Sequence, residues 1–258
     1  MTEFKYSIDS DGVAIISWDV PNKTMNVMSL EGLNELDKHF DSALSDDKVK
    51  GIVVTSGKRD FAGGMDLNVL ADMKTTQGEN PALGLFNGIM QIHKLLRKIE
   101  LAGMNPKTKK GAKPVAAAIT GTAAGIGLEL PLACHRIFAI DNEKSKIGLP
   151  EILVGIFPGA GGTTRLVRKL GAMNAAPFLL EGKMLSPSKM KLAGIIDELT
   201  DKNDLLSRAK AWVLNATDAD CIKPWDDKSY KMPGGEPYHP NGYMTFAGAS
   251  VMVNSKTQ

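Results

Sequence analysis

The chain has 258 residues, 43% of them hydrophobic, which is enough for one large domain with a buried core. Its 31 basic and 29 acidic residues give a formal net charge of +2, which favours neither a nucleic-acid partner nor a membrane surface. Cys134 and Cys221 form no Cys-x-x-Cys motif, which argues against a disulfide framework or a structural zinc site. No apolar run approaches the roughly 20 residues of a membrane-spanning helix, and the N-terminus lacks the features of a signal or transit peptide. We therefore expect a cytoplasmic protein with no membrane span.

The first part of the chain predicts a hairpin, a helix and a strand. Residues 4–9 and 13–18 flank an Asp-Ser-Asp-Gly turn and predict a β-hairpin. Ser29 can cap a helix whose apolar residues recur at three- and four-residue spacing. Residues 51–56 predict a buried strand, and Gly63-Gly64 follow it. Two glycines between a strand and a helix allow the backbone to turn amide N–H groups outward.

The same order of strand, glycine turn and helix occurs a second time. An amphipathic helix is predicted over 83–101, then a buried strand over 114–119, a glycine turn over 121–125 and a helix that carries Glu129. Further elements are expected over 137–140 and 145–147 as strands, and over 161–170, 186–194 and 204–214 as helices. The rest of the chain, from Cys221 to Gln258, is rich in proline and glycine, so we expect a linker or extended arm and a chain that is a piece of a longer enzyme.

Two glutamates stand among glycines and apolar residues, where a solvated carboxylate gains little. Glu129 lies in Gly125-Ile-Gly-Leu-Glu129-Leu, and Glu151 lies in Leu149-Pro-Glu151-Ile-Leu-Val. Carboxyl groups in apolar surroundings have a raised proton affinity, and two of them can divide acid and base chemistry. Each also has a plain structural explanation, as an exposed helix residue or as a carboxylate in the first turn of a helix.

The two glycine turns suggest a pair of converging backbone amides, which stabilise a developing oxyanion. Tight packing of a strand against a helix is the structural alternative for the glycines. A carboxyl pair and an oxyanion hole together indicate proton chemistry at the α and β carbons of a thioester.

Competing motifs are incomplete. Leu130 stands where a dinucleotide-binding fingerprint needs its third glycine, and Gly182-Lys183 is followed by Met184 where a P-loop needs Ser or Thr. Cys134 and His135 are adjacent and have no second cluster of ligands, so no metal site is expected.

The segment Lys113 to Gly171, with Phe61-Ala-Gly-Gly-Met-Asp66 before it, resembles the crotonase (enoyl-CoA hydratase/isomerase) superfamily over residues 4 to 200. The most specific part is Pro150-Glu-Ile-Leu-Val-Gly-Ile-Phe-Pro-Gly-Ala-Gly-Gly-Thr-Thr-Arg-Leu166. Within the superfamily, the chain is most similar to the N-terminal hydratase part of multifunctional fatty-acid oxidation proteins that also carry a 3-hydroxyacyl-CoA dehydrogenase part.

This resemblance implies a mixed α/β fold, a crotonase-like spiral of repeated ββα units with flanking C-terminal helices. It implies a catalytic domain over 1–200, a C-terminal helix over 201–220, and a linker or arm over 221–258 toward an absent dehydrogenase domain. No metal and no cofactor are implied, because coenzyme A is part of the substrate, and NAD would be needed only by a dehydrogenase domain in a full-length protein. The implied assembly is a homo-oligomer, trimeric or hexameric, or a complex of the full-length protein with a thiolase.

The resemblance also implies roles for individual residues. Glu151 would exchange a proton with the α-carbon, Glu129 would hold and activate water, and the oxyanion-hole amides would belong to Met65 and Ile126. Other positions would bind the substrate: Lys23, Met25, Ala62, Gly63, Gly64, Asp66, Leu67, Gly125 and Gly159. Having both glutamates favours hydration of trans-2-enoyl-CoA to 3-hydroxyacyl-CoA over Δ3,Δ2-enoyl-CoA isomerisation.

Two residues depart from the family pattern, since most relatives have a small residue in place of Met65 and glycine in place of Ile126. A left-handed backbone at Ile126 would strain its β-branched side chain, and the bulk of Met65 would narrow the acyl entry. This departure keeps a third alternative open, a module that binds CoA thioesters with weak catalysis.

Overall fold

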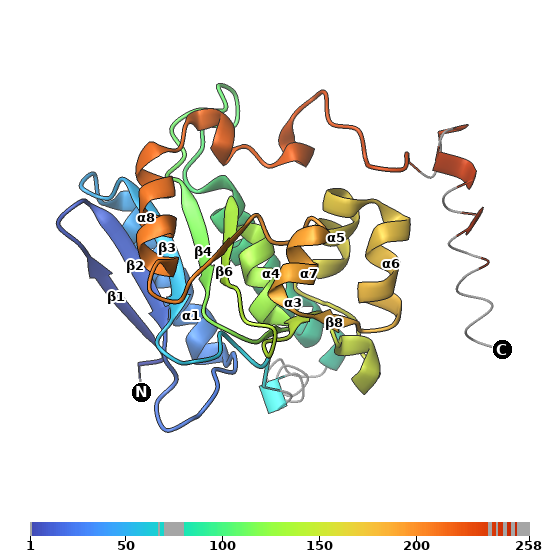
Figure 1. Cartoon of the computed structure of the whole chain (residues 1–258), viewed down its shortest axis with the longest axis horizontal. Coiled ribbons are helices and arrows are strands. Elements are labelled where there is room, and N and C mark those ends of the chain that lie inside the picture. The colour runs from blue at the N-terminus through green and yellow to red at the C-terminus, as the bar shows by residue number, and fades with distance from the viewer. Residues whose placement is uncertain are drawn as a thin grey trace.

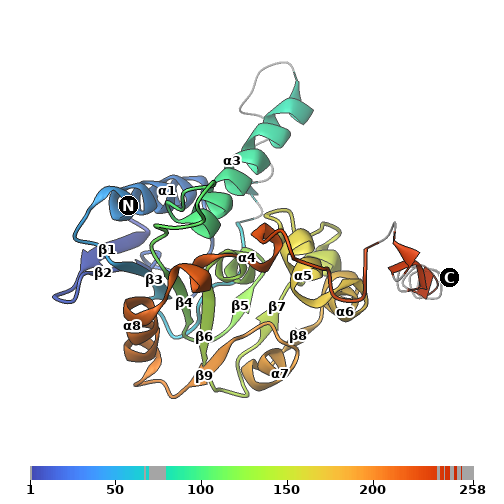
Figure 2. The same ribbon diagram turned by 90° about the horizontal axis from the view of Figure 1, so that it is seen from above.

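The computed structural model describes residues 2–66, 68–69, 80–236, 239–240, 242–244, 247–248 and 251. Its centre is a six-stranded sheet in the order β1-β2-β3-β4-β6-β9 (Figures 1 and 2). The strands are β1 Phe4–Ile8, β2 Val13–Trp18, β3 Gly51–Ser56, β4 Val115–Ile119, β6 Arg136–Ile140 and β9 Glu198–Thr200. Only the β1–β2 pair of this sheet is antiparallel, which confirms the predicted hairpin.

A small second sheet carries the turns that build the site. It contains β5 Ala123–Ala124, β7 Ile147–Gly148 and β8 Met184–Leu185 in that order. Two long strands of the first sheet each lead into a short strand of the second and then into a helix: β4 into β5 and α4 (Ile126–Ala133), and β6 into β7 and the single-turn helix η1 (Glu151–Val154). This repeated ββα order is the crotonase-like fold that the resemblance implied.

Helices cover both faces of the large sheet (Figure 1). One face is covered by α1 (Leu30–Ser45), α3 (Pro81–Leu101) and α4. Toward the other end of the fold lie η1 Glu151–Val154, α5 Gly162–Leu170, α6 Ala172–Leu180 and α7 Pro187–Leu192. Capping follows the predicted chemistry, because the Ser29 hydroxyl accepts a hydrogen bond from the Gly32 N–H at 2.9 Å.

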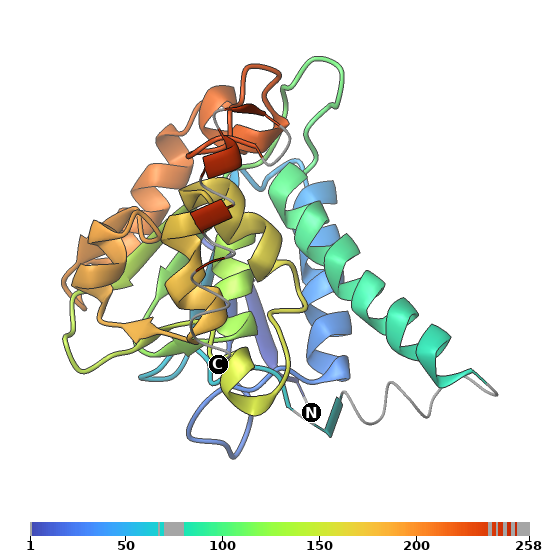
Figure 3. The same cartoon turned by 90° about the vertical axis from the view of Figure 1, so that its right-hand side faces the viewer.

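The N-terminal half of α3 extends beyond the other elements, whereas its C-terminal half packs beside α1 (Figures 2 and 3). The helix ends where Ala102 adopts a left-handed conformation with φ of 42°. Of the described helices, none combines the length and the apolar character that a membrane crossing requires.

The opposite face of the sheet is covered by α8 (Leu205–Asn215). Alternate side chains of the central strands point to the two faces, so Ile52 and Val54 enter the main core while Val53 packs beneath α8. The predicted helix at 204–214 is therefore part of the body of the molecule. Whether residues 1–200, 201–220 and 221–258 are separate units stays a prediction.

Some local predictions were incomplete. The strand expected at 145–147 is the two-residue β7, because its partners β5 and β8 are equally short. The sequence did not indicate α6, β8 or β9. The segment expected to form an arm, 221–258, begins at the last residue of the single-turn helix η2 (Asp218–Cys221) and contains a second such helix, η3 (Pro224–Asp226). Lys223, between the two, is buried.

Candidate active site

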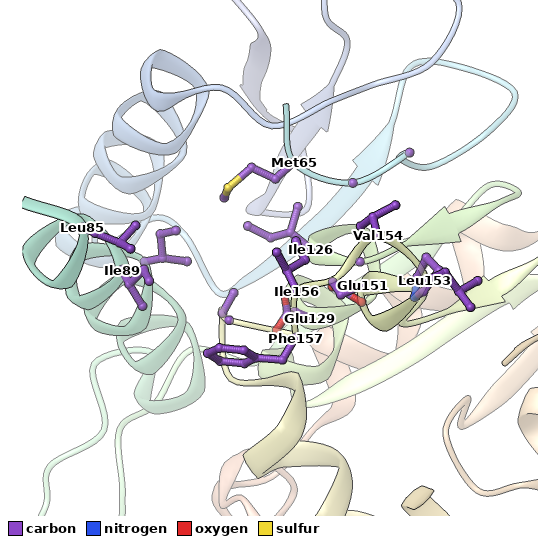
Figure 4. A pocket seen from close by; sticks show the side chains of 17 residues that line it. Met65, Leu85, Ile89, Ile126, Glu129, Glu151, Leu153, Val154, Ile156 and Phe157 are labelled. Carbon is purple, nitrogen blue, oxygen red and sulfur yellow. The ribbon is translucent and has the colours of Figure 1, made fainter. Parts of the chain in front are cut away.

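A cavity of about 590 Å³ opens between the glycine turns, α3 and the segment that follows β7 (Figure 4). Glu129 and Glu151 are the only described lining residues with polar side chains. The others are Gly63, Gly64, Met65, Leu85, Ile89, Ile92, Gly125, Ile126, Pro150, Leu153, Val154, Ile156, Phe157, Gly159 and Ala160. The cavity is therefore an apolar pocket with two carboxyl groups in its wall.

The two predicted glycine turns lie side by side. Ala62 and Ala123 pair as a parallel bridge, and the Ala124 N–H donates to the Ala62 carbonyl at 2.9 Å. Gly125 has φ of 57° and ψ of −125°, which only glycine adopts readily. A Cβ atom at Gly125 would lie 3.6 Å from the Cα of Gly64. This distance is an ordinary van der Waals contact, so the left-handed backbone at Gly125, rather than crowding by Gly64, is what requires glycine in this turn.

Within the described parts of the chain, the main-chain N–H groups of Met65 and Ile126 donate to no turn or loop carbonyl. The bridge between Met28 and Met65 uses the Gly64 carbonyl and the Asp66 N–H, so the Met65 N–H is on the opposite side of its strand. Ile126 is the first residue of α4 and has no carbonyl four residues back within the helix. Both residues line the pocket, as an oxyanion hole requires.

The strain anticipated at Ile126 does not arise. Ile126 begins α4 and is not among the residues with positive φ, because Gly125 before it takes the left-handed turn. A β-branched side chain is compatible with an ordinary helical backbone. Ile126 is 3% exposed and packs in the main core beside the pocket.

Glu129 is a buried carboxyl group, with 2% of its surface exposed. Its Oε1 accepts a hydrogen bond from the Gly162 N–H at 2.7 Å. Burial and, next, the nearby Glu151 carboxylate raise the pKa of Glu129 to about 8, although the Gly162 hydrogen bond and the Arg165 charge oppose them. A carboxyl group with a pKa raised toward neutrality is suited to general acid–base chemistry.

Glu151 begins η1 and faces the same pocket from the other side. Burial raises the pKa of Glu151 as well. Its Oε2 atom is buried and has no hydrogen-bond partner among the described residues. An unpaired carboxyl oxygen in a pocket wall is placed to act on a bound molecule.

Glycines allow both carboxyl groups to sit against the main chain. A Cβ atom on Gly125 would lie 3.0 Å from Glu151 Oε1, and one on Gly162 would lie 2.9 Å from Glu129 Oε1. These two positions therefore set the places of the carboxyl groups. The sequence analysis predicts a role for Gly125 but none for Gly162.

The other predicted binding residues divide between the pocket wall and its surroundings. Gly63, Gly64, Gly125 and Gly159 line the cavity. The other four described positions do not line it. The Lys23 Nζ atom lies 3.8 Å from a carboxyl oxygen of Asp66. Met25 packs against Gly63, and Ala62 is buried. Leu67 lies outside the described residues.

Sequence reasoning missed the apolar wall that α3 contributes. Leu85, Ile89 and Ile92 line the pocket, while Leu83 and Phe86 of the same helix are exposed. The absence of charge between residues 81 and 92 is a signal for such a helix, because a surface helix normally keeps one polar face. The apolar run after Glu151, which also enters the wall, could have been found in the same way.

No group of three His, Cys, Asp or Glu side chains that could hold a metal ion occurs in the described parts of the chain.

Comparison with known proteins places the chain in a family. A family model described as enoyl-CoA hydratase/isomerase matches residues 9–220. The fatty acid oxidation complex subunit alpha of Shewanella sp. (strain MR-4) is 34% identical over 207 residues, which cover 80% of this chain and 27% of that protein. The same subunit of Shewanella amazonensis is 35% identical with the same coverage. The chain thus spans about a quarter of the length of the curated relatives it matches.

Solved structures give the same result for the fold. The enoyl-CoA hydratase of Bacillus anthracis superposes with a TM-score of 0.68 at 27% identity, over 82% of this chain and 75% of that one. An enoyl-CoA hydratase from Polaromonas sp. JS666 has a TM-score of 0.70 at 22% identity, and the match covers 86% of this chain and 81% of that one. At this level of identity the likeness supports the fold alone. The chain belongs to the enoyl-CoA hydratase/isomerase family and is an enzyme of the crotonase type.

Proposed function

We propose that the chain is an enoyl-CoA hydratase that adds water, in a syn sense, to trans-2-enoyl-CoA. The observation that carries this proposal is the pair of carboxyl groups with raised pKa, Glu129 and Glu151, in one apolar pocket that Met65 and Ile126 also line. Repulsion between neighbouring carboxylates favours a state in which the pair holds one proton. Such a pair can accept one proton and donate another in the same reaction.

The geometry supports the following division of roles. The thioester carbonyl accepts hydrogen bonds from the Met65 and Ile126 N–H groups, which stabilise the negative charge that develops on its oxygen. Ionised Glu129 takes a proton from water as the water oxygen bonds to the β-carbon. The electron pair of the C=C bond then forms the enolate, and protonated Glu151 donates its proton to the α-carbon. A proton shift between the two carboxyl groups restores the starting state.

The acyl chain is proposed to lie along the apolar wall formed by Met65, Leu85 and Ile89, which offers a water-poor environment for it. Coenzyme A enters as part of the substrate, and the proposed reaction needs no further cofactor. The names of the relatives suggest a step of fatty-acid oxidation. Oligomeric state, a thiolase partner, a dehydrogenase part and a cytoplasmic location stay predictions.

The direct test is the loss of enoyl-thioester absorbance when the chain is mixed with crotonyl-CoA. Glu151→Gln should reduce kcat by roughly 100-fold or more, because general acid–base catalysis contributes about that much. A Glu151→Gln variant with undiminished turnover would exclude the assigned role.

Isomerisation of a 3-enoyl-CoA is the second candidate, since a single acid/base group is sufficient for it. The buried position of Glu129 beside Glu151 favours hydration, because a second carboxyl group is then available for water. Assay of a 3-enoyl-CoA distinguishes the two reactions. Calorimetry with acetoacetyl-CoA identifies the third alternative, a binding module, if binding is tight and no turnover of either substrate is seen.

A further inference from the structure

The main-chain turn Ala160–Gly162, which binds the Glu129 carboxyl group, is itself contacted by the Arg165 side chain. The N–H groups of Gly162 and Ala160 both face the Glu129 carboxyl group, the former at 2.7 Å. The Ala160 carbonyl faces the other way and accepts a hydrogen bond from Arg165 at 2.9 Å. Arg165 is one helical turn further along, on α5. A movement of this guanidinium group would therefore shift the main chain that orients Glu129.

Arg165 is fixed by an ion pair with Glu100 of α3. Their side chains are 8% and 4% exposed, and the Arg165 Nε donates to Glu100 Oε1 at 2.9 Å. A buried pair of this kind is held rigidly, because moving either charge away leaves the other without a partner. The planar guanidinium group can bind a carboxylate and a carbonyl at once in a fixed geometry, whereas an ammonium group on a flexible side chain does not fix the directions of its hydrogen bonds.

The chain of contacts continues to the C-terminal segment. The Arg97 guanidinium group donates to Glu100 Oε2 at 2.9 Å and binds both oxygens of Asp226 at 2.7 and 2.8 Å. The Asp226 carboxylate raises the pKa of Arg97 above its ordinary value, so this charge is permanent. A bidentate pair of this type is a specific and directional contact.

The same segment also reaches the helix that carries Glu129. The buried Lys223 ammonium group donates to the carbonyls of Leu132 and Cys134 at the C-terminal end of α4. A cation at this end of a helix is favoured by the helix dipole. Lys223 and Asp226 both lie beyond residue 220, where the family match ends. These two residues therefore contact the matched region from a segment outside it.

We propose that the chain of ion pairs from Asp226 through Arg97 and Glu100 to Arg165 positions the Ala160–Gly162 turn, and with it Glu129, so that the docked segment 221–226 supports catalysis. Arg165 is a positioning residue in this account, since it touches the turn and does not line the pocket. The inference deepens the proposed hydration and rests on it for its kinetic consequences.

The charged groups around Glu129 set the sign of the expected pH effect. Glu151 faces it from η1 and raises its pKa, while Arg165 faces it from α5 and lowers its pKa. Behind Arg165, α3 contributes Glu100 and Arg97, and its His93 packs against Gly161. Removing the Arg165 charge therefore favours protonated Glu129. Since water activation needs the ionised form, the acidic limb of kcat against pH should move to higher pH.

The kinetic test compares Arg165→Met with Arg168→Met, a control at an exposed position of the same helix. Arg165→Met should lower kcat for crotonyl-CoA about tenfold or more, with KM little changed, because small displacements of a catalytic group have effects of this size. Its acidic limb should shift upward, whereas Arg168→Met should match the wild type. A folded Arg165→Met protein with wild-type kcat and pH profile overturns the proposal.

A second pair of variants tests the outer link without leaving a buried charge alone. Asp226→Asn should lower kcat a few-fold at unchanged KM. Lys98→Met removes the partly exposed ion pairs between Lys98, the neighbour of Arg97 on α3, and the α1 residues Asp37 and Asp41, and it should not lower kcat. Both are measured well below their melting temperatures. If Asp226→Asn behaves like Lys98→Met, the C-terminal segment has no part in positioning Glu129, and the proposal fails in this respect even where Arg165→Met does not fold.

An infrared titration separates this proposal from the proposed function. The carbonyl band of a protonated buried carboxyl group is followed with pH, and the band lost in Glu129→Gln is assigned to Glu129. In Arg165→Met the band should persist to higher pH than in the wild type, regardless of any turnover. A wild type that does not hydrate crotonyl-CoA but shows this shift contradicts the function alone, and an unshifted titration contradicts the positioning role.

Discussion

At the scale of single residues, the site depends on what surrounds two carboxyl groups rather than on the groups themselves. Burial is the main cause of the raised pKa of both Glu129 and Glu151. The sequence allowed this to be predicted because glycines and apolar residues flank both positions. The partners of Glu129 could not be predicted, since Gly162 and Arg165 lie more than 30 residues away along the chain.

Glu129 should make the folded protein less stable as the pH rises. Its pKa is raised from 4.5 to about 8, so between these values the folded state binds more protons than the unfolded state, and stability decreases with pH. Glu129→Gln removes this ionisation and should raise the melting temperature at pH 9 by on the order of a few degrees. The difference should be much smaller at pH 5. Calorimetric scans at the two pH values measure it, and equal differences at both would contradict the assignment.

Gly162→Ala should reduce hydration without unfolding the chain. The added Cβ would lie 2.9 Å from Glu129 Oε1, and Gly162 is not among the residues with positive φ, so the effect is steric. We expect kcat to fall about tenfold or more. Gly248→Ala is the matched control, since nothing lies within 4 Å of the position of its Cβ. Equal kcat for the two variants would show that contact with Glu129 does not matter.

At the scale of elements, α3 links the pocket to the rest of the fold. Its N-terminal half lines the cavity with Leu85, Ile89 and Ile92, and its C-terminal half carries Arg97 and Glu100. Periodicity predicted the helix and its buried stripe but not the pocket, because the pattern of apolar residues alone does not distinguish a core face from a ligand-binding face.

Bulk on the pocket face of α3 should change the preference for acyl length. Leu85→Trp should raise KM for a long-chain 2-enoyl-CoA much more than for crotonyl-CoA, because only a long chain needs this wall. Leu83→Trp, at a position that is 52% exposed on the same helix, is the control. Comparison of kcat/KM for the two substrates tests the idea, and an equal effect on both would place the acyl chain elsewhere.

At the scale of the whole molecule, two cores hold the sheet that carries the site. The larger core lies beneath α1, α3 and α4, and the smaller lies beneath α8. The sequence predicted most long strands and helices, because their apolar patterns are continuous. It did not predict the short strands β8 and β9, because such strands depend on partners that are distant in the sequence. It did not predict α6 either, which has a proline, Pro177, inside the helix.

The smaller core should contribute measurably to stability. Leu205→Ala removes a side chain that is 4% exposed, so it should lower the free energy of unfolding by about 2 kcal/mol or more. Leu206→Ala, at a neighbour that is 38% exposed, should change it by less than about 1 kcal/mol. Urea unfolding of both variants measures the difference. Similar values for the two would mean that α8 is not packed on the sheet as described.

The most direct measurement of the central claim is a double-substitution cycle on crotonyl-CoA hydration, using Glu129→Gln, Glu151→Gln and the protein with both changes. Because the two carboxyl groups act in one reaction, each single change should lower kcat by roughly 100-fold or more, and both together should lower it little further than the worse single change. Wild-type kcat in either single variant, or losses that simply multiply in the double variant, would contradict a shared role in hydration.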